Sequence, residues 1–268
     1  MVTPDRFERQ SFLGWNAQEQ IATCIVGVVG LGGGGSHIIQ QLAHIGFKRY
    51  VIYDDDTVED SNLNRLVGGT TVDEKSHSPK LLIARRTIFG LQSDAEVEGL
   101  SVKWQEQPEP LRRCHLVFGC VDSYRGRQEL EIAMRRYLIN YIDIGMDVHG
   151  TDAPLISGQV ILSTPGGPCM KCLGFLTDEK LQEEAMKYGK AGSRPQVVWP
   201  NGVLASSAVG LAVELVTNWT RRARAYEYLV YDGNKGVVNQ SITMRNRTQH
   251  NCPHFSLNDV GDPVFLEI

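Results

Sequence analysis

The chain has 268 residues, of which 42% are hydrophobic, and its formal net charge is −4 at pH 7. This length and composition allow one large domain or two small ones with a substantial core, and they exclude an intrinsically disordered chain. The weakly acidic charge and the lack of a dense Lys/Arg block argue against nucleic acid as the main partner.

Three features predict a cytoplasmic protein without a membrane span. The first ten residues, MVTPDRFERQ, are polar and lack the basic-then-apolar pattern of a secretory signal. Six cysteines in such a chain are expected to be thiols or metal ligands rather than disulfides. The longest apolar helical run, residues 202–219, contains Glu214 and many small residues, which favours a helix packed inside the protein.

The first predicted segment, residues 5–23, is a short polar arm with a helix near residues 16–21. Arg6 and Arg9 in this arm carry planar guanidinium groups, which match the geometry of phosphate oxygens. Two interpretations stay open here, a solvated surface arm and an arm that reaches a phosphate.

The next segment predicts a strand, a glycine turn, a helix and a second strand. An apolar run at residues 24–29 precedes the turn, an amphipathic segment runs to Ile45, and a second apolar run ends in Asp54. The turn contains Gly30, Gly32, Gly33, Gly34 and Gly35. A helix beginning at Gly35 or Ser36 would point its free N–H groups at a phosphate, and Asp54 is placed to hold a ribose hydroxyl. This stretch alone fits a dinucleotide or ATP, and a phosphate-free turn is the alternative.

The segment after Asp54 is polar, and a helix follows it. Residues 61–65 show no strand or helix pattern, so we expect a loop there. Ser78 and Pro79 predict the start of an amphipathic helix, with the serine as its cap. Lys80 would lie in the first turn, where the helix dipole opposes its charge. This position favours an anionic partner, with a surface lysine as the alternative.

Alternating strands and helices continue to residue 150. Strands are expected at residues 95–102, 115–119 and 138–145, with a helix at residues 124–137. This order predicts a doubly wound, mostly parallel, Rossmann-like α/β sheet, whose ligands bind beyond the carboxyl ends of the strands. The residues predicted at such ends, and therefore in one crevice, are Gly30, Asp54, Asp122 and Gly145. The basic pair Arg135–Arg136 is expected on a solvated face near a helix end.

The second half of the chain has a different pattern, which predicts a mixed or antiparallel sheet. We expect one continuous domain over residues 1–268, with a nucleotide-binding half at 1–150 and a second half at 151–268. The expected elements of the second half are a strand at 157–164, a turn at 165–168, a helix at 178–188, a mobile loop at 189–195, a helix at 202–219, and strands at 226–231 and 236–244.

A series of motifs runs along almost the whole chain. The motifs are the arm RFERQ at 6–10, the glycine turn at 30–35, DDDTV at 54–58 with SNLNR at 61–65, SPK at 78–80, CVD at 120–122 and CMKC at 169–172. In this order they resemble the ThiF/MoeB/HesA family, the adenylating proteins related to the ubiquitin-activating enzymes.

The resemblance implies ATP-dependent adenylation of the C-terminal carboxylate of a ubiquitin-like or sulfur-carrier protein with a flexible tail, with release of pyrophosphate. It also implies a homodimer, in which the N-terminal arginine acts on the partner subunit's site. The implied catalytic residues are Arg65, Lys80, Asp122 and Arg9, with nucleotide contacts from Gly30, Gly32, Gly33, Gly35, Asp54, Asp56 and Asn62.

The chemistry of these side chains agrees with ATP. Cations at Arg65 and Lys80 can neutralise a triphosphate, and a carboxylate at Asp122 suits Mg²⁺. A dehydrogenase that uses NAD needs none of these three groups, so the set favours ATP over a dinucleotide.

The cysteines near the C-terminal half predict a structural zinc site. Cys169 and Cys172 have the two-residue spacing of zinc ligands, and the family supplies a second pair near the C-terminus. Here Phe255 takes the place of the fourth cysteine, so Cys252 with His254 or His250 would complete a Cys₃His site. The alternative is that these cysteines are reduced thiols.

A second departure from the family concerns the step after adenylation. Relatives that take the carrier onto their own thiol keep a cysteine before the last long helix, and residues 177–205 contain none. We therefore expect the chemistry to stop at the adenylate unless a conjugating enzyme or sulfurtransferase supplies the thiol. The alternatives are adenylation of another carboxylate, on a peptide or a modified tRNA base, and a nucleotide-binding scaffold without turnover.

Overall fold

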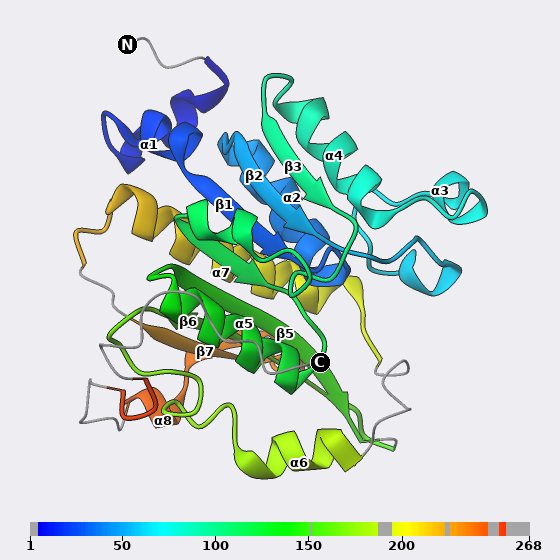
Figure 1. Ribbon diagram of the computed structural model, residues 1–268, viewed down its shortest axis with the longest axis vertical. Helices are drawn as coiled ribbons and strands as arrows, with labels where there is room; N and C mark the ends of the chain where they lie inside the picture. Colours follow the sequence, from blue (N-terminus) through cyan, green and yellow to red (C-terminus); the bar gives the residue numbers. More distant parts are fainter. Residues whose placement is uncertain (1–4, 151, 187–194, 223–225, 246–251, 256–268) are drawn as a thin grey trace.

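The computed structural model describes residues 5–150, 152–186, 195–222, 226–245 and 252–255. Its centre is one eight-stranded sheet with the order β3-β2-β1-β4-β5-β6-β7-β8 (Figure 1). The predicted combination of a parallel Rossmann-like half with an antiparallel half in a single sheet is confirmed.

The parallel half of the sheet holds the expected strands. Central strand β1 (Ile25–Val29) pairs with β2 (Arg49–Tyr53) on one side and with β4 (Leu116–Gly119) on the other. β3 (Glu96–Leu100) forms the edge beside β2. The sequence of β1, IVGVV, is apolar throughout because helices cover both faces of a parallel sheet.

Helices form a layer on each face of the sheet. One face is covered by α1 (Ala17–Thr23), α2 (Gly33–Ile45), α4 (Lys80–Leu91) and α7 (Val198–Thr217), which share a core with the strands. The other face is covered by α5 (Tyr124–Arg136) and η3 (Glu109–Arg113). Figure 1 shows α5 in front of the sheet, with α2 and α7 behind it.

The antiparallel half begins where β5 (Asn140–His149) turns back as β6 (Leu155–Ser163). β7 (Glu227–Asp232) and β8 (Val237–Gln240) complete this edge of the sheet. The second predicted strand of this pair, 236–244, is too long, because the short helix α8 (Ile242–Arg245) replaces its second part.

Three other sequence predictions need correction. β5 runs to His149, so Gly145 lies inside the strand opposite Gln159 and not at a strand end. The serine at position 78 does not cap α4, since Pro79 is the N-cap residue and provides no side-chain bond. Among the described residues, the elements that were not predicted are the short helices η1 (Asp5–Leu13), η2 (Asp60–Asn62), α3 (Thr71–Lys75) and η3, together with α8.

Helix α7 is the predicted apolar helix, and it begins earlier than expected, at Val198. Its length and mean hydropathy of 1.2 would allow it to cross a membrane. However, 56% of its most apolar stretch is buried inside the protein. Leu204, Ala208 and Ala212 belong to the core that α7 shares with α2 and the sheet. The expected packing of this helix inside the protein is confirmed. Helix α6 (Asp178–Met186) precedes it, and most of the predicted loop 189–195 lies outside the described residues.

Candidate active site and metal centre

The glycine turn joins β1 to α2 and can only be built with glycine at two positions. Gly30 has a φ of +90°, and a Cβ there would lie 2.6 Å from the carbonyl oxygen of Cys120. At Gly35 a Cβ would lie 1.9 Å from the carbonyl oxygen of Gly30. The helix begins at Gly33, two residues before the earliest predicted start, so Gly33, Gly34 and Gly35 supply its first N–H groups. Such N–H groups have no acceptor within the helix and form an anion site.

Asp54, at the end of β2, fastens this turn to the sheet. Its Oδ2 accepts a hydrogen bond from Leu31 N at 2.6 Å, and its Oδ1 accepts one from Asp56 N at 3.0 Å. Burial raises the pKa of the Asp54 carboxyl, and the nearby charge of Lys80 opposes that shift. A carboxylate oxygen has a second lone pair, so Asp54 can still accept from a ribose hydroxyl.

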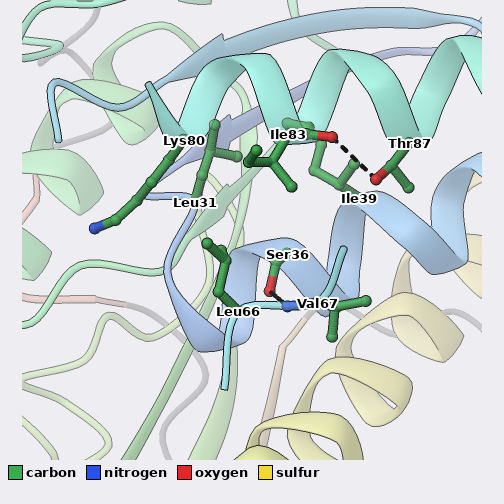
Figure 2. Close-up of a pocket in the computed structure, with 9 residues that line it drawn as sticks. Leu31, Ser36, Ile39, Leu66, Val67, Lys80, Ile83 and Thr87 are labelled. Carbon is green, nitrogen blue, oxygen red and sulfur yellow. Dashed lines mark hydrogen bonds between the residues drawn. The ribbon is translucent and has the colours of Figure 1, made fainter. Parts of the chain in front are cut away.

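Lys80 lies in the first turn of α4 and is paired within the protein. Its Nζ is 2.6 Å from Asp56 Oδ2, with the lysine side chain 9% exposed and that of Asp56 66% exposed. In Figure 2 the Nζ of Lys80 is directed away from the small cavity behind the glycine turn. That cavity, about 10 Å³, holds at most one water. A nucleotide would therefore bind on the outer side of the turn.

Arg65 lies over the first turn of α2. Its Cδ would be 3.3 Å from a Cβ placed on Gly33. Its Nη1 donates to Ser61 O at 2.5 Å and to Asn64 Oδ1 at 3.0 Å. The predicted cation thus lies beside the predicted anion site. Asn62 has a local role, because its Oδ1 accepts from the backbone N–H of Glu59 and caps η2.

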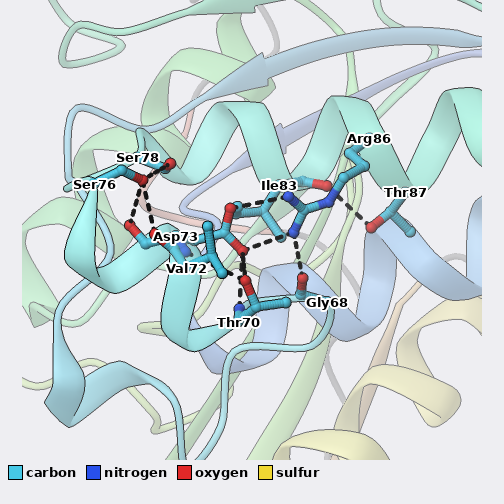
Figure 3. Close-up of polar contacts among 9 residues, drawn as sticks. All are labelled: Gly68, Thr70, Val72, Asp73, Ser76, Ser78, Ile83, Arg86 and Thr87. Carbon is cyan, nitrogen blue, oxygen red and sulfur yellow. Dashed lines mark hydrogen bonds and ion pairs between the residues drawn. The ribbon is translucent and has the colours of Figure 1, made fainter.

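Helix α3 anchors the segment that follows Arg65. Asp73 accepts hydrogen bonds from Arg86 Nη1 at 2.9 Å and from Thr70 Oγ1 at 2.6 Å (Figure 3). Arg86 also donates to Gly68 O at 2.7 Å. These bonds attach residues 68–73 to α4 and limit the freedom of the preceding loop.

Asp122 follows β4 and is exposed. Burial raises the pKa of the Cys120 thiol, and the charges of Asp143, Asp122 and Asp54 raise it further. Asp54 and Asp122, at the ends of strands on either side of β1, therefore both lie near Cys120. The structure places Arg65 beside Gly33 and Lys80 beside Asp56 and Asp54, with Asp122 at the end of the strand next to β1. We call this predicted arrangement of residues the crevice.

Arg9 lies away from this crevice. Its helix η1 is attached at the other end of the sheet, where Gln10 Nε2 donates to Ile45 O and Arg6 Nη1 donates to Leu91 O. Those carbonyls belong to the last turns of α2 and α4, and the 13 residues of α2 span about 20 Å. Arg9 does not join the glycine turn of its own chain.

The sequence did not identify a buried ion pair beside the crevice. Arg127 of α5 and Asp143 of β5 are joined at 2.5 Å, and Arg127 also donates to Ile144 O at 2.9 Å. Tyr141 OH donates to Asp143 Oδ1 at 3.0 Å. Burial raises the pKa of Asp143, and the Arg127 charge opposes this shift. The pair holds the first turns of α5, and so the position of Asp122, against the sheet. The sequence feature that could have indicated this pair is Asp143, an aspartate within the buried part of β5.

Asn64 and Asn201 were also missed, because their partners are distant in sequence. Asn64 Nδ2 donates to Gln196 O at 3.0 Å, across 132 positions. Asn201 of α7 is buried, and its Nδ2 would lie 2.6 Å from a Cβ on Gly33. The start of α7 is therefore part of the surroundings of the glycine turn.

Four side chains form a candidate metal centre. The ligand atoms of Cys169, Cys172, Cys252 and His254 all lie within 4.8 Å of one another. His254 Nδ1 is 3.4 Å from Cys169 Sγ and 3.3 Å from Cys172 Sγ, and the Sγ atoms of Cys172 and Cys252 are 3.6 Å apart. Tetrahedral zinc with bonds of about 2.3 Å to sulfur separates its ligands by about 3.8 Å. The donor set and spacing fit zinc, and His250 lies outside the described residues.

The residue at the fourth-cysteine position, Phe255, packs on a buried arginine. Its ring centroid is 4.7 Å from the guanidinium carbon of Arg135. Arg135 donates to Ser163 Oγ at 2.8 Å and to Gly167 O at 2.5 Å. The prediction that Arg135 lies on a solvated face is therefore wrong. A cation–π contact takes the place of a metal bond at this position.

A sequence profile of the ThiF family matches residues 7–254. Among curated proteins, the chain is 32% identical over 174 residues to the SAMP-activating enzyme E1 of Haloferax volcanii, covering 63% of this chain and 61% of that protein. It is 32% identical over 182 residues to the sulfur carrier protein adenylyltransferase of Thermus thermophilus, covering 63% of each. It is 26% identical to the ubiquitin-like modifier-activating enzyme 5 of Drosophila willistoni, covering 80% of this chain and 54% of that protein. The chain thus spans less than two thirds of these relatives.

Solved structures share the fold. A crystal structure of E. coli MccB with succinimide has a TM-score of 0.73 at 15% identity, over 97% of this chain and 75% of that chain. A structure of E. coli MccB with ATP has a TM-score of 0.70 at 16% identity, over 89% of this chain and 72% of that chain. At these identities the likeness concerns the fold.

Proposed function

This chain belongs to the ThiF family, and we propose that it uses ATP to adenylate the C-terminal carboxylate of a ubiquitin-like or sulfur-carrier protein. The observation that carries the proposal is that Arg65 lies over the first turn of α2 while Lys80 is held beside Asp54 and Asp56 at the end of β2. Asp122 is exposed after the neighbouring strand β4. The names of two relatives, an activating enzyme and a sulfur carrier protein adenylyltransferase, support the same reaction.

The chain's own groups would bind and polarise the triphosphate. The first N–H groups of α2 and the guanidinium of Arg65 would bind phosphate oxygens, and Asp54 and Asp56 would bind the ribose. The carrier carboxylate attacks the α-phosphorus, and the bond to the bridging oxygen breaks as pyrophosphate leaves. Arg65 and Lys80 stabilise the charge that builds on the leaving group.

Asp122 is the proposed Mg²⁺ ligand. Its exposed carboxylate at the end of β4 is a hard oxygen donor, which Mg²⁺ prefers. The bound ion would supply further neutralisation of the triphosphate.

Lys80 must exchange Asp56 for a phosphate oxygen in this scheme. The exchange replaces one anionic partner of the buried ammonium group by another, and water can solvate the 66% exposed carboxylate of Asp56 once it is released. The pair keeps the lysine oriented toward the crevice before ATP arrives.

The second half of the chain, residues 151–268, is proposed to hold the carrier and a structural zinc. Cys169, Cys172, Cys252 and His254 would bind zinc, which would tie residues 252–255 to the turn after β6. A cytoplasmic, reducing setting suits these thiols, and all six cysteines are free.

The proposed assembly is a homodimer in which Arg9 reaches the partner subunit's crevice. The location of η1 at the far end of the sheet supports action in trans rather than in cis. A conjugating enzyme or a sulfurtransferase is the proposed acceptor downstream, since residues 177–205 contain no cysteine.

Exchange of labelled pyrophosphate into ATP tests the reaction. We expect exchange that requires Mg²⁺ and a carrier protein ending in glycine, and that falls at least about 100-fold in Arg65→Ala because a transition-state charge contact is lost. A short peptide serves as an alternative acid in a parallel reaction. Exchange unchanged in Arg65→Ala would refute the assignment of this crevice.

A further inference from the structure

The beginning of α7 is tied to the crevice by side chains from separate elements. We call residues 196–201 the α7 start. Asn64 Nδ2 donates to Gln196 O at 3.0 Å. Asn201 Nδ2 donates to Val197 O at 3.0 Å. Two consecutive backbone carbonyls of the α7 start are therefore held by side chains.

Asn64 makes the bond that leads directly to a proposed catalytic cation. Its Oδ1 accepts from Arg65 Nη1 at 3.0 Å, while its Nδ2 donates to Gln196 O. One amide group thus bridges the guanidinium of Arg65 and the α7 start. A change at either end alters the bond at the other, because both bonds are made by the same planar group.

Close packing strengthens this connection. A Cβ on Gly33 would lie 2.6 Å from Asn201 Nδ2, and one on Gly34 would lie 3.6 Å from Asn201 Oδ1. A Cβ on Gly202 would likewise lie 3.3 Å from Cε1 of the His37 ring. The first turn of α2 and the α7 start therefore leave no space between them, so a movement of one displaces the other.

The α7 start also offers a surface for an extended substrate. Val198 and Trp199 are 39% and 55% exposed, directly after the residues that Asn64 and Asn201 hold. A flexible tail that carries a carboxylate toward the α-phosphate would pass along this segment, and apolar side chains would contact it.

We propose that Asn64 is a positioning residue that couples the binding of ATP at Arg65 to the placement of the α7 start, and thereby sets the affinity for the carrier tail. The inference rests on the proposed adenylation. When Arg65 binds the triphosphate, its hydrogen bond to Asn64 breaks. The side-chain amide of Asn64 then reorients, together with the carbonyl of Gln196 to which it is bonded. ATP binding thus prepares the path for the second substrate.

Kinetics of pyrophosphate exchange separate this role from general support of the fold. Asn64→Leu removes both bonds at similar volume, and we expect the carrier KM to rise about fivefold to tenfold while the ATP KM and kcat change less than about twofold. Asn64→Gln keeps the amide and is expected to recover most of the carrier affinity. Ser206→Ala, on the exposed side of the same helix, is the control. Equal increases of both KM values, or no increase, would overturn the proposal.

Hydrogen exchange without carrier provides a readout that does not depend on turnover, and its decisive comparison uses the wild-type chain alone. Mg-ATP is expected to protect residues 30–36 and to change exchange in peptides covering 196–202, and Asn64→Leu is expected to lose most of the second effect. Protection at 30–36 with no change at 196–202 in the wild-type chain would refute the coupling alone. No protection at 30–36 would refute the nucleotide site as well.

Discussion

Single charged side chains organise the crevice before any ligand binds. Asp54 uses both carboxylate oxygens to hold the backbone at Leu31 and Asp56, and Asp56 in turn holds the ammonium group of Lys80. Each group therefore has a structural partner in addition to its proposed ligand. Functional side chains that are oriented in this way lose less conformational entropy when the nucleotide arrives.

The buried carboxylate of Asp73 leads to a prediction about the stability of the fold. Hydrogen bonds from Arg86 hold the pKa of this buried carboxyl well below its usual value, although burial opposes the shift. Asp73→Asn removes the charge and one acceptor, and we expect the free energy of unfolding to fall by about 2 kcal/mol at pH 7.

The pH dependence of this loss checks its cause. A lowered pKa stabilises the fold fully above the unfolded value of about 3.9, and the stabilisation is lost as the pH falls through the folded value. Urea titrations should therefore give a constant difference between pH 5 and 8 that shrinks below about pH 4. Asp94→Asn is the control, because its pair with Lys48 is exposed and should contribute little. A difference that stays the same at pH 3 would contradict the electrostatic explanation.

Among the elements, the metal centre joins two separate segments of the second half, and α5 of the first half supports it. The turn after β6 carries Cys169 and Cys172, the segment 252–255 carries the other two ligands, and Arg135 of α5 supports Phe255. A bound zinc would lower the free energy of this arrangement, because the ligands are far apart in sequence and must otherwise be ordered by packing alone.

Zinc content is predicted to depend on Cys172 and not on cysteines elsewhere. The wild-type chain and Cys24→Ala should each bind one zinc, whereas Cys172→Ser should bind almost none. Removal of zinc by a chelator is expected to lower stability by about 2 kcal/mol, or Tm by about 6 °C. Metal analysis together with thermal unfolding measures both effects. One zinc retained in Cys172→Ser would exclude this cluster.

The long elements could be predicted from sequence, and the short ones could not. The apolar runs of β1, β2 and β4 and the periodic helix α5 follow local patterns that determine their type. η2 and α3 have too few residues for a period, and their caps depend on side-chain bonds such as that of Thr70 with Asp73. β5 extends past Gly145 because it pairs with β6 over its whole length, and this pairing is a tertiary interaction.

The position of helix α6 also depends on tertiary interactions and could not be predicted from sequence. Its type was predicted, yet its packing depends on Glu184, whose two carboxylate oxygens accept from Tyr124 N and Arg125 N at 2.9 Å. A carboxylate at the first turn of α5 is favoured by the free N–H groups and the helix dipole. The bonds cross 60 and 59 positions, so no local pattern reveals them.

On the scale of the whole molecule, one sheet connects the nucleotide half to the half proposed to bind the carrier. β5 belongs to both, since it is parallel to β4 and antiparallel to β6. The candidate site was predicted where residues cluster at strand ends, as for Asp54 and Asp122. The contributions of Asn64, Asn201 and Arg127 were not predicted, because they depend on how α5 and α7 pack on the sheet.

The proposed homodimer predicts complementation between two inactive variants. Arg9→Ala should lose exchange activity because it removes a group from the partner subunit's crevice. Asp122→Ala should lose it because it removes a group from the crevice of its own subunit. Mixed after subunit exchange, half of the dimers contain one intact site, so about a quarter of wild-type activity should return. Activity that stays at the level of the separate variants would refute the action of Arg9 in the partner subunit's crevice.

The most direct measurement is the intact mass of a carrier protein after incubation with this chain and Mg-ATP. We predict an AMP adduct on the C-terminal carboxyl of the carrier, formed together with pyrophosphate, and no adduct with Arg65→Ala or with a carrier whose C-terminal carboxylate is amidated. Conversion of ATP to ADP without an adduct on any carrier or peptide would contradict adenylation.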